Sequence, residues 1–233
     1  MDGPAQQALY EENERRDVLP YIPPDARSAL DVGCARGGFG VSLRKVLGPD
    51  ARIVGVEAVP AQAAIARKGH GYDEVFDGYF PGALAHAGVE PFDLIAFNDV
   101  LEHILDPEDV LVQARGHLAP NGRVVAVIPS IQYAPVVMSL LRGRWDYTDS
   151  GTLDRTHVRF FTRATMIEMF SRAGYTVELC EGINSVRQEW RQDPFGPRRL
   201  AKLVLERALG DARFLQFVVV ANRDLPTVAG TTA

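Results

Sequence analysis

Short apolar runs alternate with longer amphipathic stretches over the first half of the chain. The apolar runs cover residues 28–33, 51–59, 72–78, 92–100 and 122–130. Runs in which polar residues are this sparse are typical of strands that are buried on both faces, as in a parallel sheet. Because helical patterns separate these runs, the sequence predicts a doubly wound α/β fold.

The stretch after the fourth apolar run carries clear helix signals. Asp106 can cap a helix, and Pro107 suits its first position. Apolar residues then recur on one helical face, at Val110, Leu111, Ala114 and Leu118. Residues 119–122, with the letters APNG, predict a turn before the fifth strand.

The second half of the chain has a different pattern. Residues 131–161 show no clear strand, so we expect a substrate-side insert there. Thr162 can cap a helix, and residues 176–182 and 213–223 have the pattern of two further strands.

The domain organisation follows from these patterns. No linker divides the chain, which predicts one domain over residues 28–223. Residues 1–27 predict a helical lead-in to that domain. Residues 224–233 lack periodicity, which predicts a disordered tail.

Composition narrows the class of protein. The chain has 233 residues, enough for one large α/β domain, and its net charge of −5 argues against a broad nucleic-acid-binding face. Its two cysteines suit neither a disulfide framework nor a zinc site. No apolar run reaches the roughly 18 residues that a membrane span needs. We therefore expect a cytoplasmic protein without nucleic-acid partners or integral membrane association, and the sequence does not indicate its oligomeric state.

A glycine-rich stretch follows the first strand, where residues 29–40 read ALDVGCARGGFG. Its spacing approximates the G-x-G-x-x-G of dinucleotide-binding loops, whose glycines let a ligand approach the backbone. The free N–H groups of the helix that follows point at that ligand. Glu57 lies 20 residues after Gly37, at the distance at which a carboxylate reaches ribose hydroxyls.

Asp31 decides between the cofactors that such a loop can hold. It lies two residues before Gly33, where its charge would repel a pyrophosphate. A ligand with a ribose, an adenine and an ammonium group would instead be attracted. S-adenosylmethionine has these groups and no phosphate, so we expect it as the cofactor.

The same residues resemble a known family, the class I S-adenosylmethionine-dependent methyltransferases. These enzymes carry D/E-x-G-x-G-x-G after the first strand, and this chain reads DVGCARG over residues 31–37. They carry an acidic residue after the second strand, here Glu57, and many have a run similar to FDLIAFNDVLEHILDP, here residues 92–107. A turn similar to LxPNG occurs at residues 118–122. The resemblance spans roughly residues 8–222 and implies a Rossmann-like sheet of seven strands, mostly parallel, with an antiparallel last strand.

The resemblance also implies which residues bind the cofactor. They are Asp31, Gly33, Ala35, Gly37, Glu57, Asp77, Asn98 and Asp99. Ala35 stands where the family has its middle glycine, and alanine disfavours positive φ, so we expect a slightly different loop shape there. Asp77 is our choice for the acidic residue that binds the adenine amino group, with Tyr79 as the alternative. Arg36 can pair with the methionine carboxylate, although we favour a solvated side chain.

A hydroxyl acceptor needs a base to take its proton during methyl transfer, whereas an amine needs little beyond alignment. Asp99 and His103 follow the fourth strand, whose end borders the expected crevice. His157 lies in the insert, where Asp154 could orient it. The base can be Asp99, His103 or His157, and the sequence leaves the choice open.

The insert also bears on the acceptor. Residues 143–162 combine aromatic, charged and polar side chains, which suits a polyol or sugar ring. The run GTLDRTHVRFFT, residues 151–162, is similar to a segment of bacterial methyltransferases of surface-polysaccharide and glycolipid biosynthesis. The leading hypothesis is therefore O-methylation of a sugar hydroxyl in a glycan or sugar-nucleotide intermediate.

Two alternatives stay open at this point. Enzymes that methylate a quinone or another small aromatic acceptor share the DVLEHI segment, residues 99–104. An NAD(P)-dependent oxidoreductase is the alternative of another class. No spacing of ligand residues demands a metal, so we expect none.

Overall fold

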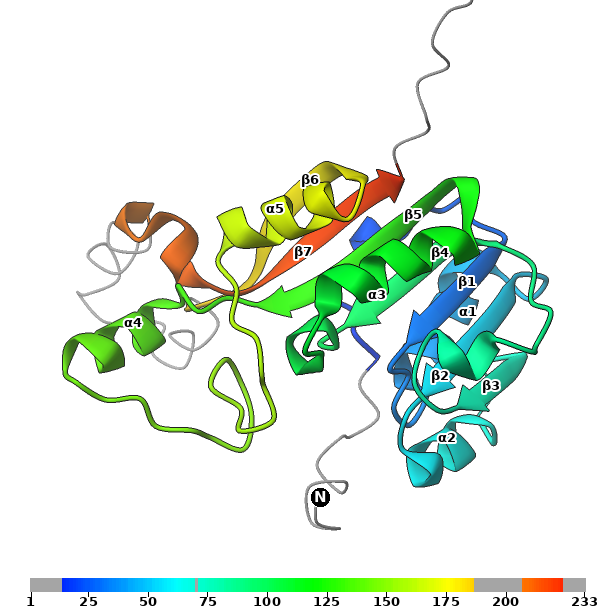
Figure 1. Cartoon of the computed structure of the whole chain (residues 1–233), viewed down its shortest axis with the longest axis horizontal. Coiled ribbons are helices and arrows are strands. Elements are labelled where there is room, and N and C mark those ends of the chain that lie inside the picture. The colour runs from blue at the N-terminus through cyan, green and yellow to red at the C-terminus, as the bar shows by residue number, and fades with distance from the viewer. Residues whose placement is uncertain (1–13, 70, 187–206, 224–233) are drawn as a thin grey trace, which may run out of the picture.

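A single sheet of seven strands forms the centre of the molecule (Figure 1). The computed structural model describes residues 14–69, 71–186 and 207–223. The strands are β1 (Ser28–Val32), β2 (Arg52–Glu57), β3 (Glu74–Asp77), β4 (Phe92–Asn98), β5 (Leu118–Pro129), β6 (Tyr175–Ser185) and β7 (Phe214–Arg223). They lie in the order β3-β2-β1-β4-β5-β7-β6, and β7 is antiparallel to both of its neighbours. This confirms the predicted doubly wound fold with its antiparallel last strand.

Helices cover both faces of this sheet (Figure 1). The described α-helices are α1 (Gly38–Leu47), α2 (Pro60–Ala66), α3 (Pro107–Ala114), α4 (Ala134–Leu141) and α5 (Arg163–Arg172). Short 3-10 turns are η1 (Leu19–Tyr21), η2 (Gly82–Leu84), η3 (Leu101–His103), η4 (Arg115–His117) and η5 (Gly210–Arg213). No helix among the described residues is long and apolar enough to cross a membrane.

Two apolar cores lie on opposite faces of the sheet because side chains alternate along each strand. On β5, Val124 and Ala126 join the core under α3 and α5, whereas Val125 and Val127 join the core under α1. All four side chains are fully buried. The near-continuous apolar runs of the sequence therefore mark strands that are covered on both faces, as predicted.

The helix signals around residue 106 are confirmed. The Asp106 carboxylate accepts a hydrogen bond from the backbone N–H of Asp109 at 3.1 Å, which caps α3. Thr162 caps α5, and its hydroxyl exchanges hydrogen bonds with Thr165 in a capping box. The predicted apolar face of α3 is buried against the sheet.

Two local predictions need correction, and one helix was not predicted. The turn predicted at residues 119–122 does not precede β5 but is a bulge within it. Leu118 pairs with Phe92 and Arg123 pairs with Leu94, so the four residues between Leu118 and Arg123 are left out of the regular pairing. The helix α4 lies inside the insert, where no helix was predicted, and Figure 1 shows it beyond the end of β5. Over residues 14–27 the predicted helical lead-in is only the turn η1, and residues 1–13 and the tail lie outside the described residues.

Candidate functional site

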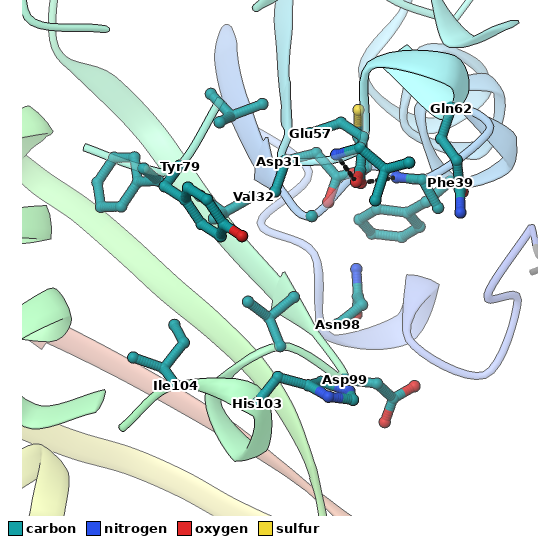
Figure 2. A pocket seen from close by; sticks show the side chains of 18 of the residues that line it. Asp31, Val32, Phe39, Glu57, Gln62, Tyr79, Asn98, Asp99, His103 and Ile104 are labelled. Atoms are coloured by element: carbon teal, nitrogen blue, oxygen red, sulfur yellow. Dashed lines mark hydrogen bonds between the residues drawn. The ribbon is translucent and has the colours of Figure 1, made fainter. Parts of the chain in front are cut away.

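A cleft of about 770 Å³ opens at the carboxyl ends of β1, β2 and β4 (Figure 2). The chain order of the sheet reverses here, since β2 lies on one side of β1 and β4 on the other. This is the place where doubly wound sheets bind ligands. Most of the predicted site residues line the cleft: Asp31, Gly33, Ala35, Glu57, Asn98, Asp99 and His103.

The loop between β1 and α1 forms one wall of the cleft. Gly33 has φ +75°, and a Cβ added to it would lie 2.6 Å from Val100, so only glycine fits there. Gly37 does not line the cleft but caps α1 with φ +97°, and it acts through the shape of the loop. Ala35 also adopts a positive φ, +47°, a left-handed conformation that has a steric cost for alanine.

Glu57 holds this loop in place from the end of β2. One carboxylate oxygen accepts a hydrogen bond from the backbone N–H of Ala35 and the other from the N–H of Val59, both at 2.8 Å. The carboxylate is thus fixed between two loops at the edge of the cleft, and its remaining lone pairs are those that a ribose hydroxyl pair can use.

Asp31 lies at the bottom of the cleft and is 1 % exposed. Burial raises the pKa of its carboxyl to about 7, and the nearby charge of Glu57 acts in the same direction. A hydrogen bond from the Tyr72 hydroxyl, at 2.5 Å, partly offsets this increase. A cationic ligand at this point would supply the positive charge that a buried carboxylate needs.

Asn98 ends β4 with its side chain in the cleft (Figure 2). Both its amide nitrogen and its amide oxygen are buried, and neither has a hydrogen-bond partner among the described residues. Leaving two buried polar atoms unpaired costs stability. A ligand that pairs with both atoms accounts for an asparagine at this position.

Asp99 belongs to a ring of polar side chains that joins the N-terminal segment to β4, β6 and β7. Its carboxylate pairs with the guanidinium of Arg15 and accepts a hydrogen bond from the amide of Gln216. Asn184 donates to Gln216 at 2.8 Å and to Asp17 at 3.0 Å, and Arg15 pairs with Asp17 at 3.2 Å. Because both Asp99 oxygens are engaged, the ring disfavours Asp99 as the base.

His103 lines the cleft beyond Asp99. Its Nδ1 lies 3.3 Å from the carbonyl oxygen of Thr156, and since a carbonyl can only accept, Nδ1 carries the proton and Nε2 is left as an acceptor. Burial lowers the pKa of His103, and repulsion from His157 lowers it further. His103 is therefore neutral near pH 7 and able to take a proton.

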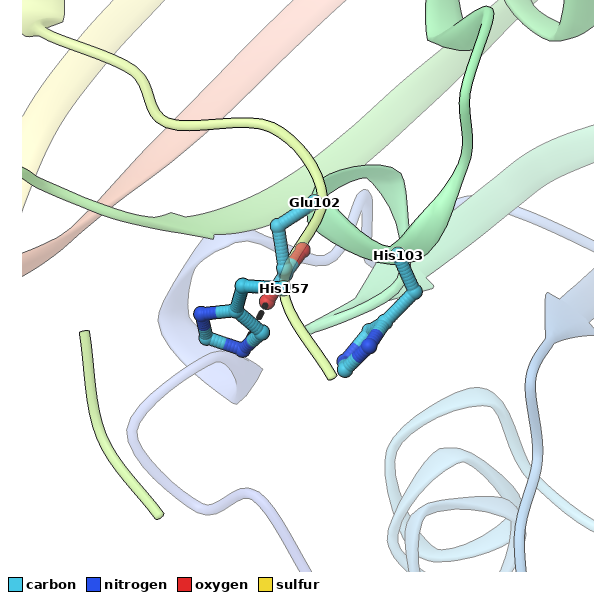
Figure 3. A group of neighbouring side chains, drawn as sticks. All are labelled: Glu102, His103 and His157. Atoms are coloured by element: carbon cyan, nitrogen blue, oxygen red, sulfur yellow. Dashed lines mark ion pairs between the residues drawn. The ribbon is translucent and has the colours of Figure 1, made fainter. Parts of the chain in front are cut away.

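His157 does not line the cleft, contrary to its predicted role as a base in contact with substrate. It is buried behind His103, and the two rings meet edge to face at a centroid distance of 4.8 Å (Figure 3). Its Nδ1 bonds the carbonyl of Thr152 at 3.0 Å, and its Nε2 faces Glu102 at 3.9 Å.

Glu102, His103 and His157 form the group of described side chains with the donor types of a metal centre (Figure 3). Their ligand atoms spread over distances of up to 4.8 Å. The three side chains are thus candidate ligands by type and proximity, and the expectation of no metal stays a prediction.

The predicted adenine residue, Asp77, is not among the residues that line the cleft. Its exposed carboxylate pairs with Arg67 on the outer side of β3. The neighbouring residues Gly78, Tyr79 and Phe80 line the cleft instead. Gly78 has φ +131° and turns the chain just after β3, and Tyr79 follows this turn at the cleft, so the geometry favours this alternative.

Three lining residues were not assigned from the sequence. Gln62, in the first turn of α2, is 4 % exposed, and its amide oxygen has no partner within the described ranges. Arg36 lines the cleft with a buried Nε, so it is not the solvated side chain that we favoured. Phe39 contributes an apolar wall. The only feature of the sequence that could have indicated these three residues is their position close to the glycine-rich loop or to Glu57.

S-adenosylmethionine fits this set of groups. The loop glycines leave room for a close backbone approach, and the unpaired atoms of Asn98, Gln62 and Arg36 offer donors and acceptors. The buried Asp31 carboxylate suits an ammonium group. Glu57 has lone pairs left for a ribose hydroxyl pair, and the buried carboxyl of Asp31 disfavours a pyrophosphate beside it.

Known proteins support the same assignment. The model of the family described as methyltransferase domain matches residues 7–179. The ubiquinone biosynthesis O-methyltransferase of Cereibacter sphaeroides is 25 % identical over 164 residues, 68 % of this chain and 64 % of that protein. The mitochondrial enzyme of the same description from Schizosaccharomyces pombe is 24 % identical over 178 residues, 73 % of this chain and 63 % of that protein. The alignments thus span less than two thirds of these relatives.

Solved structures with this fold include a SAM-dependent methyltransferase from Archaeoglobus fulgidus, at TM-score 0.63 and 14 % identity over 88 % of this chain and 90 % of that one. The mitomycin 7-O-methyltransferase matches at TM-score 0.60 and 16 % identity over 91 % of this chain and 54 % of that one. These likenesses show the fold. Since the family model matches well over half of the sequence, the chain belongs to the family described as methyltransferase domain.

Proposed function

We propose that this chain methylates a hydroxyl group of a small aromatic acceptor of the quinone type, with His103 as the general base. The observation that carries the proposal is the state of His103 in the cleft. Its Nδ1 is committed to Thr156, and its lowered pKa leaves Nε2 free to accept a proton.

The cofactor's place follows from the residues on the β1 and β2 side of the cleft. Asp31 would hold its ammonium group and Glu57 its ribose, with Asn98 and Gln62 as further hydrogen-bonding groups. When bound, S-adenosylmethionine supplies a methyl group already activated by the sulfonium. The chain's own task is therefore to orient the acceptor, exclude water and take the acceptor's proton.

The strength of the base favours a phenolic acceptor. Proton transfer is efficient when the donor and the base have similar pKa values. A phenol titrates near about 10, as tyrosine does, and a histidine with a lowered pKa titrates below about 6.5. A sugar hydroxyl is a far weaker acid than a phenol. His103 is thus better matched to a phenol than to a sugar.

The wall around His103 is also apolar. Val100, Ile104, Val110 and Val158 line the cleft there, and Phe80 lies at its adenine side. Such a wall suits a flat ring that makes few hydrogen bonds. Of the insert cluster that suggested a polyol site, only Arg155, Thr156 and Val158 line the cleft, while Trp145 packs against Phe160 away from it.

The comparisons support the aromatic acceptor over our leading sequence hypothesis. The curated relatives named above are described as ubiquinone biosynthesis O-methyltransferases, whereas none of the curated matches is described as a surface-glycan enzyme. Membership of the methyltransferase-domain family also removes the support for an NAD(P)-dependent oxidoreductase. The cytoplasmic location, the partners and the sugar acceptor stay predictions.

An acceptor panel tests the proposal. The protein is incubated with S-adenosylmethionine and either catechols and hydroquinones with and without an alkyl side chain, or sugar nucleotides, and products are identified by mass spectrometry. We expect methylation of the phenolic compounds, and loss of turnover with retained cofactor binding in His103→Gln. Methylation of a sugar nucleotide alone, or full turnover in His103→Gln, would overturn the proposal.

A further inference from the structure

The segment of the insert around His157 is bound tightly to the turn η3. The backbone N–H groups of Val158 and Arg159 both donate to the carbonyl of Glu102, at 2.9 and 3.0 Å. The side chain of Arg159 donates to the carbonyl of Leu105 at 2.8 Å. In return, the Nδ1 of His103 donates to the carbonyl of Thr156. The insert and the turn that carries His103 therefore form one unit.

Glu102 projects into the interior of this unit (Figure 3). Its side chain is 1 % exposed, and neither carboxyl oxygen has a hydrogen-bond partner among the described residues. The Nε2 of His157 lies 3.9 Å from one of these oxygens. Burial, with the nearby charge of Asp99, raises the pKa of Glu102 well above its ordinary value. Its carboxyl is therefore neutral and carries a proton that it can donate.

A buried glutamic acid without a full partner is costly. A leucine of similar size would fill the same space without the desolvation penalty, and such replacements are often neutral or stabilising. Stability therefore does not explain why this position holds a carboxyl group. A role in holding another group does.

His157 is the group that Glu102 can hold. Because the Nδ1 of His157 donates to Thr152, its Nε2 is the acceptor that faces the Glu102 carboxyl. The same ring meets the ring of His103 in an edge-to-face contact. Fixing the plane of His157 thus fixes the plane of His103 and the direction of its Nε2.

We propose that Glu102 and His157 form a buried positioning pair that holds His103 in the orientation in which it takes the acceptor's proton. This inference rests on the proposed function, because it assigns a support to the base named there. Neither side chain lines the cleft, so neither contacts substrate or cofactor.

The test compares three variants of the full chain by steady-state kinetics with the phenolic acceptor that the panel identifies. Glu102→Leu fills the space but cannot donate, so we expect kcat to fall at least about tenfold through misorientation of the base. Glu102→Gln keeps an N–H donor toward His157, so we expect it to stay within about threefold of the wild type. Glu108→Gln, on the exposed face of α3, is the matched control, with unchanged kinetics expected.

Stability and cofactor binding separate positioning from folding. Glu102→Leu should unfold at the same temperature as the wild type or higher, and bind S-adenosylhomocysteine with unchanged affinity. If Glu102 had a merely structural role, the kcat of Glu102→Leu would instead stay close to that of the wild type. Equal activity in the Leu variant and the wild type, or equal losses in the Leu and Gln variants, would overturn the pairing.

A titration independent of turnover completes the test. The imidazole of His103 is followed by NMR against pH in the complex with S-adenosylhomocysteine, in the wild type, His157→Gln and the exposed control His86→Gln. Because His157 lowers the pKa of His103, His157→Gln should move the midpoint of His103 upward, and the control should not move it. Asp99 at the end of β4 and Asp154 of the insert, which both raise the pKa of His103, stay in place. The charged and titratable groups nearby also stay, namely Arg15 of the N-terminal segment, Glu102 of η3 and Arg155 of the insert.

The two proposals fail in different ways. If no acceptor is methylated by the wild type but the His103 midpoint moves in His157→Gln alone, the proposed function fails and the contact between the two histidines stands. If methylation occurs and the midpoint stays unchanged in His157→Gln, the positioning pair is wrong and the proposed function stands.

Discussion

The hydroxyl of Tyr72 donates a hydrogen bond to the buried carboxylate of Asp31 across 2.5 Å. The same hydroxyl oxygen accepts a hydrogen bond from the backbone N–H of Gly40, in the first turn of α1, at 3.0 Å. Tyr72 thus connects the acidic group at the bottom of the cleft to the helix whose N-terminus faces the ligand. The protonation of Asp31 therefore controls how well the cleft receives a cation.

Cofactor binding should depend on pH through Asp31. Its pKa is about 7 in the free protein, and an ammonium group favours the ionised form. The affinity for S-adenosylhomocysteine should therefore rise as pH increases toward 7, by up to about tenfold per pH unit below that value. Isothermal titration between about pH 5.5 and 7 measures this slope. A flat profile, or the same slope in Asp31→Asn, contradicts the assignment.

The dependence on pH has the opposite sign for the stability of the cofactor-free protein. The pKa of Asp31 in the folded protein lies above its ordinary value of 3.8, so the folded state holds the proton longer than the unfolded state. The free energy of unfolding of the cofactor-free protein should thus contain a contribution that is lost as pH rises from about 4 to about 7. Added cofactor should reverse part of that loss.

Removing the Tyr72 hydroxyl should weaken binding at neutral pH. In Tyr72→Phe the Asp31 carboxylate loses a hydrogen bond that lowers its pKa, so a smaller fraction is ionised at pH 7. We expect the dissociation constant for S-adenosylhomocysteine to increase by roughly threefold to tenfold at pH 7, and the slope with pH to extend to higher values. Tyr147→Phe, at an exposed side chain of the insert, is the control. Equal affinities for Tyr72→Phe and the wild type would contradict this account.

Ala35 offers a test of loop geometry. Its φ of +47° is unfavourable for alanine and free of cost for glycine. Ala35→Gly should therefore increase the free energy of unfolding by about 0.5–1 kcal/mol, with cofactor binding retained. Gly33→Ala is the opposite case, because its Cβ would meet Val100 at 2.6 Å, and it should lose both stability and binding. Chemical denaturation of both variants decides, and a destabilised Ala35→Gly would be inconsistent with the loop described here.

Replacing Asn98 with an apolar residue should weaken cofactor binding without lowering the free energy of unfolding. Its two buried amide atoms lack partners within the described residues, so Asn98→Leu should leave the free energy of unfolding unchanged or raise it by roughly 1 kcal/mol. The same change should weaken S-adenosylhomocysteine binding about tenfold, since it removes hydrogen-bonding groups from the cleft. Asn222→Leu, on the exposed side of β7, should not affect binding. Unchanged binding in Asn98→Leu would show that the cofactor does not use this side chain.

The sequence predicted the parts of this structure that depend on local patterns. The strands, the caps Asp106 and Thr162, and the loop with Asp31 and Glu57 follow from periodicity and spacing over a few tens of residues. It missed what depends on contacts between distant segments. The partner of Asp31 is Tyr72, 41 residues away, and nothing near either residue indicates the pair.

The choice of base shows the same limit. Asp99, His103 and His157 were equivalent in the sequence, but the structure engages Asp99 in a ring with Arg15 and Gln216 and places His157 behind the cleft wall. Asp77 and Tyr79 lie two residues apart, and which of them lines the cleft depends on how the chain leaves β3. Distances in sequence do not contain that information.

The measurement that tests the central claim most directly is isothermal titration of the protein with S-adenosylmethionine and S-adenosylhomocysteine, for the wild type, Asp31→Ala and Glu57→Ala. Asp31 is expected to bind the ammonium group, and Glu57 orients both the ribose and the loop through Ala35 and Val59. The account predicts micromolar binding in the wild type and its loss in both variants. Absence of binding in a folded wild-type protein, or undiminished binding in both variants, would contradict it.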